Sequence, residues 1–159
     1  MNRHRLVTGL IFGLAVAGSP PNASAQQFTT KKYAEAGGWT IQVHAADGQF
    51  MRCGAVVPGG KVSFEISSEG WTLSLPTAKP APADEVKGAL EIDGKSVKAA
   101  YLGGDEGRLM TFLKPAQLKQ IRAAKTLTAT AGQEQTPGPL AGIDAALRKA
   151  GECNDKGGG

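Results

Sequence analysis

The stretch that decides the fold is WTIQVHAADGQFMRCGAV, residues 39–56. Apolar side chains at Trp39, Ile41 and Val43 alternate with polar ones, and a period of two is typical of a strand with one buried face. The dipeptide Asp-Gly at residues 47–48 then predicts a tight hairpin turn, after which a second strand begins. This stretch therefore predicts an antiparallel β-hairpin.

The same alternation continues along the chain at a spacing of about ten residues, which is typical of an antiparallel sheet. Asp-Gly at residues 93–94 marks another hairpin turn, residues 133–139 are expected to be a loop, and apolar residues recur at helical spacing over residues 115–125 and 140–150. The expected fold is mainly β: an antiparallel β-sandwich or roll of about seven to eight strands with one or two short helices near the C-terminus. Further strands are expected over residues 62–66, 71–75, 89–92, 97–101, 109–113 and 126–131.

The first 25 residues have the pattern of a cleavable export signal. Two arginines precede an apolar run over residues 6–17 that is too short to span a bilayer, and Ala-Ser-Ala at residues 23–25 offers a cleavage site before Gln26. An uncleaved membrane anchor is the alternative. We expect the processed protein to be periplasmic or secreted, with no insertion into a membrane.

Processing leaves a chain that suits one domain. Residues 26–37 are expected to form a flexible N-terminal arm, residues 38–153 a single β-rich domain, and residues 154–159 a disordered tail. The proline-rich residues 76–84 are expected to be an extended surface connection. The formal net charge of +4 falls to +2 when the two arginines of the signal are removed, and no cluster of Lys and Arg remains. The chain is therefore not expected to bind nucleic acid.

Two cysteines remain after processing, Cys53 and Cys153. In an oxidising compartment such a pair is most simply a disulfide, which would join the last helix to an early strand. It would close a loop of about 100 residues, for which the chain-entropy model gives roughly 4–5 kcal/mol. A reactive thiol or a metal ligand is the alternative, but neither cysteine has a CxxC partner.

No residues of the processed chain form a recognisable catalytic, cofactor or metal motif. A Ser-His-Asp or Cys-His site would have to use His44, the only histidine left, which lies on the polar face of its strand and is expected to be solvent-exposed. We therefore expect no catalytic residue, no cofactor and no metal. Asp105 and Glu106, in a glycine-rich loop, leave a carboxylate-based hydrolase as an alternative.

Four aromatic side chains lie on the apolar faces of the expected strands: Trp39, Phe64, Trp71 and Tyr101. Core packing is the favoured interpretation. The alternative is a ligand-binding face like that of a sugar-binding sheet, on which Trp39 and Trp71 would be exposed.

Several short motifs follow one another in a distinctive order. After the leader come a strand that begins with Gly-Trp at residues 38–39, then Cys53, then Leu-Pro at residues 75–76. The motif LEIDG follows at residues 90–94, and a final helix carries Leu140, Gly142, Ala146 and Leu147.

This order, over residues 38–150, resembles the invasion-associated locus B family of exported bacterial proteins. The cysteine that this family usually has in the first strand and its middle pair are missing here, and Cys153 is additional. The resemblance implies a β-sandwich-like exported protein without known catalytic residues, linked in some members to host-cell entry.

The expected function is that of an exported, non-enzymatic binding or interaction protein of the bacterial envelope, with an envelope or host protein as its partner. The alternative is a periplasmic carrier of a small hydrophobic or sugar ligand, for which a concave sheet face is suited.

Overall fold

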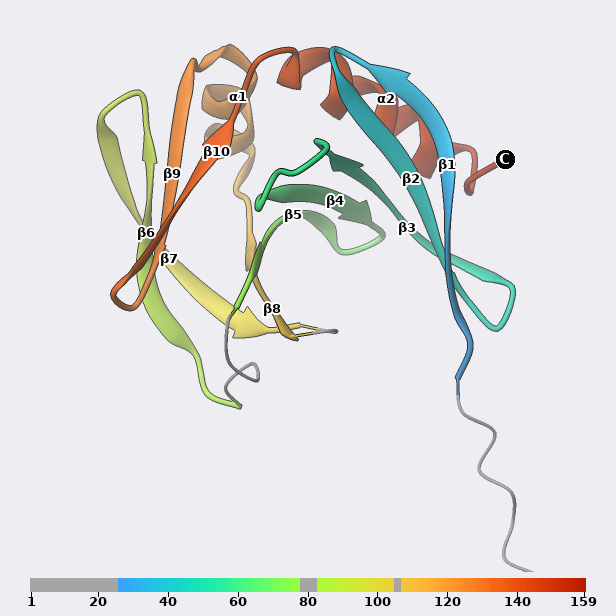
Figure 1. Ribbon diagram of the computed structural model, residues 1–159, viewed down its shortest axis with the longest axis horizontal. Helices are drawn as coiled ribbons and strands as arrows, with labels where there is room; N and C mark the ends of the chain where they lie inside the picture. Colours follow the sequence, from blue (N-terminus) through green and yellow to red (C-terminus); the bar gives the residue numbers. More distant parts are fainter. Residues whose placement is uncertain (1–25, 78–82, 105–106) are drawn as a thin grey trace, which may run out of the picture.

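The computed structural model describes residues 26–77, 83–104 and 107–159 (Figure 1). The expected signal peptide and the pair Asp105 and Glu106 therefore lie outside the described residues. Within the described part, the chain forms one antiparallel sheet of ten strands and two helices. The sheet curls into a half-barrel, with the helices at one end of it (Figure 1).

The strand order across the sheet is β1-β2-β3-β4-β5-β8-β7-β6-β9-β10. The expected turn at Asp47-Gly48 is confirmed, since both residues have positive φ angles, of 50° and 78°, as a type I′ hairpin turn requires. The elements are β1 (Phe28–Ala36), β2 (Trp39–Ala46), β3 (Gln49–Val56), β4 (Ser63–Ser67), β5 (Gly70–Pro76), β6 (Val86–Ile92), β7 (Lys95–Gly103), β8 (Arg108–Phe112), α1 (Pro115–Ala123), β9 (Thr126–Ala131), β10 (Glu134–Pro139) and α2 (Ile143–Asp155).

The mainly β, antiparallel prediction is confirmed, but the two edge strands are additions to it. Residues 28–36, expected as a flexible arm, pair with β2 as β1, and residues 134–139, expected as a loop, pair with β9 as β10. β10 carries Pro137 and Pro139, which a ladder tolerates only at an edge. The ten strands form a single curled sheet, not two packed sheets.

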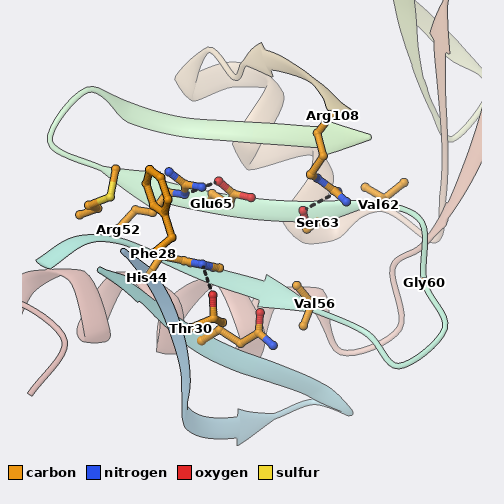
Figure 2. Close-up of a pocket in the computed structure, with 12 residues that line it drawn as sticks. Phe28, Thr30, His44, Arg52, Val56, Gly60, Val62, Ser63, Glu65 and Arg108 are labelled. Atoms are coloured by element: carbon orange, nitrogen blue, oxygen red, sulfur yellow. Dashed lines mark hydrogen bonds and ion pairs between the residues drawn. The ribbon is translucent and has the colours of Figure 1, made fainter. Parts of the chain in front are cut away.

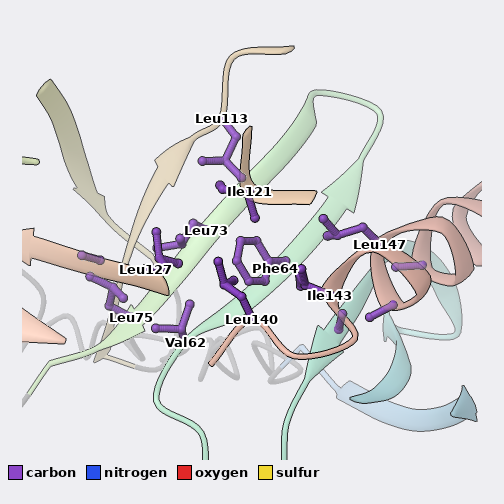
Figure 3. Packing of buried hydrophobic residues seen from close by; sticks show 14 of the residues in the cluster. Val62, Phe64, Leu73, Leu75, Leu113, Ile121, Leu127, Leu140, Ile143 and Leu147 are labelled. Carbon is purple, nitrogen blue, oxygen red and sulfur yellow. The ribbon is translucent and has the colours of Figure 1, made fainter. Parts of the chain in front are cut away.

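The hydrophobic core covers one face of the sheet (Figure 3). The strand register aligns Ile41, Ala55, Phe64 and Leu73 across β2 to β5, and all four are fully buried. In Figure 3 the ring of Phe64 lies beside Ile143 and Leu147 of α2, and both of those side chains are buried. The helix thus covers the apolar face of the first strands.

Helix α2 is attached to the sheet near both of its ends. The predicted disulfide is confirmed: Cys153 of α2 is bonded to Cys53 of β3, with their Cα atoms 6.1 Å apart. Before the helix begins, the Ala141 carbonyl accepts a hydrogen bond of 2.8 Å from Trp39 Nε1. Beside it, a Cβ added at Gly142 would lie 2.6 Å from the Cα of Gly37, so these two glycines allow the backbones to touch.

The C-terminal end differs from the prediction. The helix expected over residues 140–150 continues to Asp155, so Gly151 lies inside it. The segment expected to be a disordered tail turns back toward β2: the Gly158 amide donates to the Cys153 carbonyl at 2.9 Å, and a Cβ added at Gly158 would lie 2.7 Å from a methyl group of Val43.

Removing the disulfide should destabilise the fold. The double variant Cys53→Ala, Cys153→Ala is expected to lose about 2–5 kcal/mol of unfolding free energy, because the unfolded chain regains the freedom of a long loop. Urea denaturation of the variant and of oxidised and reduced wild type measures this. The variant and the reduced wild type should unfold at a similar, lower urea concentration; equal midpoints for all three would contradict the prediction.

The close approach of Gly142 to Gly37 provides a second test. Gly142 has a φ of 71°, and a Cβ there would collide with the Gly37 backbone, so Gly142→Ala should lower the unfolding free energy by about 2 kcal/mol. The matched control is Gly151→Ala, inside α2 with open space around its Cα. It should raise the unfolding free energy by about 0.5–1 kcal/mol, because alanine favours a helix. The changes are measured by thermal denaturation. Equal changes in the stability of Gly142→Ala and Gly151→Ala would contradict the close contact between Gly142 and Gly37.

Candidate functional site

The sheet has a second face, which is polar and points away from α2. Since Cys53 points toward α2, its neighbour Arg52 on β3 points the other way. The strand register brings His44 of β2 and Glu65 of β4 onto this same face. A cavity of about 450 Å³ opens there (Figure 2). It is lined by Phe28, Thr30, Gln42, His44, Met51, Arg52, Val56, Gly60, Val62, Ser63, Glu65 and Arg108.

Arg52 and Glu65 form an ion pair in this cavity. Arg52 Nε lies 2.8 Å from Glu65 Oε2, and the two side chains are only 25% and 12% exposed. The Nε group is not oriented for a hydrogen bond to that oxygen, so the contact is electrostatic. A guanidinium carries five N–H donors, and the buried Nε of Arg52 has no hydrogen-bond partner among the described residues. A ligand in the cavity would be bound by the terminal Nη groups of Arg52.

Arg108 is the second arginine that lines the cavity. Its Nε donates to Ser74 Oγ at 2.7 Å, and its Nη2 donates to Ser63 Oγ at 3.0 Å and to the Ser74 carbonyl at 3.1 Å. Both serines are buried, so Arg108 satisfies hydroxyl groups that the fold has removed from water. These bonds fix the position of the guanidinium on the sheet.

His44 is partly buried, so the expectation of a solvent-exposed side chain is wrong. Strand β1 covers it and places Thr30 Oγ1 at 3.0 Å from His44 Nδ1. The ring lies over Gly54, where an added Cβ would be 3.1 Å from Nε2. The position of the imidazole therefore depends on two features. Strand β1 supplies Thr30, and Gly54 leaves space for the ring because it has no side chain.

The arrangement is suited to binding an anionic group. Among the described residues, the charged side chains that line the cavity are Arg52, Arg108 and Glu65. Arginine binds carboxylate and phosphate groups through paired N–H donors. Val56 and Phe28 add apolar surface that can contact the remainder of a small molecule.

The shifted pKa values belong to structural contacts outside this cavity. Hydrogen bonds from Lys149 and Lys156 lower the pKa of Glu152 to about 2, which ties together the last turns of α2. Burial raises the pKa of Tyr101 to about 12, and its hydroxyl donates to the Ala89 carbonyl. Both shifts are explained by folding and need no catalytic role.

The two tryptophans proposed for a ligand-binding face lie elsewhere. Trp39 is 1% exposed and packs edge-on against Phe64, with ring centroids 5.8 Å apart. Trp71 is partly buried against the core. Neither lines the cavity. Trp39 is therefore a core residue, as the favoured interpretation of the aromatic residues expects.

The residues of the cavity carry only a weak signal in the sequence. Alternation places Glu65 and His44 on polar faces of their strands, but it does not show that these faces meet. Their meeting depends on the register of β2, β3 and β4, and on β1, which has no apolar alternation.

Three further observations bear on the kind of site. In the described ranges, no group of three or more His, Cys, Asp or Glu residues is placed to hold a metal ion. No helix in the same ranges has the length and apolar character to cross a membrane. Comparison with protein-family models, curated proteins and solved structures gives no match. The resemblance to the invasion-associated locus B family therefore stays a prediction.

Proposed function

We propose that this protein is an exported, non-enzymatic binding protein of the bacterial envelope, and that the polar cavity binds a small anionic ligand. The observation that carries the proposal is the guanidinium of Arg52 in the lining of the cavity, held in place by its ion pair with Glu65. A guanidinium fixed in a cavity of this kind favours an anion over a neutral molecule.

The size and shape of the cavity support a small organic ligand. Its volume of about 450 Å³ lies within the range typical of small-molecule sites. A carboxylate or phosphate group would be bound by Arg52, while Val56 and Phe28 contact the less polar part. This is a more specific form of the small-ligand carrier, with an anionic group in place of the purely hydrophobic or sugar ligand.

Titration of the oxidised protein, lacking residues 1–25, tests the proposal. Isothermal calorimetry with inorganic phosphate and with succinate should show binding, and glucose should bind less tightly. Arg52→Gln should weaken binding of both anions by about tenfold or more, because a charge-assisted hydrogen bond is lost. Glu65→Gln should act in the opposite direction and tighten binding, because a competing carboxylate is removed.

The control is Arg148→Gln on α2, across the sheet from the cavity, where the side chain is 69% exposed and pairs with Asp144. Its anion affinity should equal that of wild type. Thermal denaturation of each variant checks that the fold is intact. Equal binding of glucose, or unchanged anion binding in a folded Arg52→Gln variant, would contradict an anion site at this position.

Export is tested separately on the full chain. Expressed in a Gram-negative host, the protein should be recovered from the periplasm or the medium with an intact mass that begins at Gln26, because Ala-Ser-Ala at residues 23–25 fits the cleavage rule. The matched control is Ala25→Arg, which removes the small residue before the cleavage site and should leave the precursor uncleaved. Recovery of the uncleaved wild-type chain in the cytoplasm would contradict export.

A further inference from the structure

The sheet opens between β7 and β8. β7 pairs with β6 over seven residues, from Lys95 to Tyr101, but pairs with β8 only at Leu102 and Gly103. Continuing that register would place Ala100 opposite Phe112, where β8 ends before Pro115 begins α1. Among the described residues, no strand pairs with the remaining length of β7 on this side. The backbone of β7 is thus an open strand edge inside the sheet.

A groove of about 630 Å³ lies at this opening, with β7 on one side and the end of β8 and the start of α1 on the other. Its lining includes Leu102 and Phe112, which are 44% and 47% exposed. These are two of the three large hydrophobic side chains that are exposed in the described part of the chain. Exposed apolar side chains beside an unpaired strand edge are the features of a surface that accepts an added strand.

Among the described residues, the charges that line the groove are mainly positive. Lys87, Lys98 and Lys114 line it together with Glu85. Lysine on an open edge discourages pairing with a second copy of the same edge, and it favours a strand that carries carboxylates. In β7 the side chains of Lys98 and Leu102 point to the same face, away from the buried Tyr101.

We propose that this groove binds an extended, acidic segment of a partner polypeptide, which adds as a strand to the open edge of β7. The backbone of the segment bonds to β7, its acidic side chains lie across from Lys98, and its apolar side chains contact Leu102 and Phe112. This site is separate from the polar cavity, so it stands whether or not the cavity binds an anion.

The test uses the full processed, oxidised protein and a short fluorescein-labelled peptide of Glu-Thr-Val-Thr repeats, in which glutamate and valine lie on the same face of the strand, as Lys98 and Leu102 do. Fluorescence anisotropy should show saturable binding of this peptide and much weaker binding of the same peptide with lysine in place of glutamate. Lys98→Glu should weaken binding of the glutamate peptide by about tenfold or more and strengthen binding of the lysine peptide. Lys98 is exposed, so the variant should fold normally.

Two controls separate strand addition at β7 from other binding. Lys31→Glu changes an exposed lysine on β1, the outer edge strand, and should leave peptide affinity unchanged. N-methylation of the glutamate peptide at every second residue, in each of the two registers, should abolish binding in one register only, because only one edge of the peptide faces β7.

The proposal is overturned if wild type does not bind the glutamate peptide, if both N-methylated forms bind as well as the parent peptide, or if Lys31→Glu rather than Lys98→Glu removes binding. The last result would place the segment at β1. The phosphate affinity of the same Lys98→Glu sample should match that of wild type. A failure of peptide binding at β7 is therefore distinguishable from a failure of anion binding in the polar cavity.

Discussion

The attachment of α2 to the first four strands is the constraint on which the rest of the structure depends. A disulfide joins the helix to β3, and contact between Gly142 and Gly37 joins its beginning to the β1–β2 turn. Between these two points, Ile143 and Leu147 are buried against the sheet. The helix therefore determines which face of β1 to β4 becomes the core, and because side chains alternate along a strand, it also determines which side chains face the other way.

The two faces have different consequences for function. The face under α2 is filled by the apolar side chains of the core, whereas the opposite face carries Arg52, Glu65 and Arg108 around a cavity. A partly buried ion pair such as that of Arg52 and Glu65 is weak support for stability, because taking both charges partly out of water opposes their attraction. These are the charged groups that the proposed anion site would use. The opening between β7 and β8 is a separate feature of the sheet, lined by Lys87, Lys98 and Lys114.

Much of the fold could be predicted from periodicity. In the strands around Trp39, Phe64 and Leu73 apolar side chains alternate with polar ones, so the period of two is visible in the sequence, and Asp-Gly turns mark two of the hairpins. β1 and β10 could not be found in this way, because edge strands are exposed on much of their surface and β10 contains two prolines. The disulfide could be inferred because only two cysteines were available. The cavity could not, because Arg52, His44 and Thr30 come together only through strand register and through β1.

The central claim is that the attachment of α2 organises β1 to β4 and thereby the polar cavity. Amide hydrogen exchange of the oxidised and the reduced protein, followed segment by segment, tests it most directly. The account predicts that reduction increases exchange first in α2 and in β1 to β4, while β6, β9 and β10 keep their protection, since they do not depend on the Cys53–Cys153 bond. Unchanged exchange throughout, or an equal increase in every strand, would contradict it.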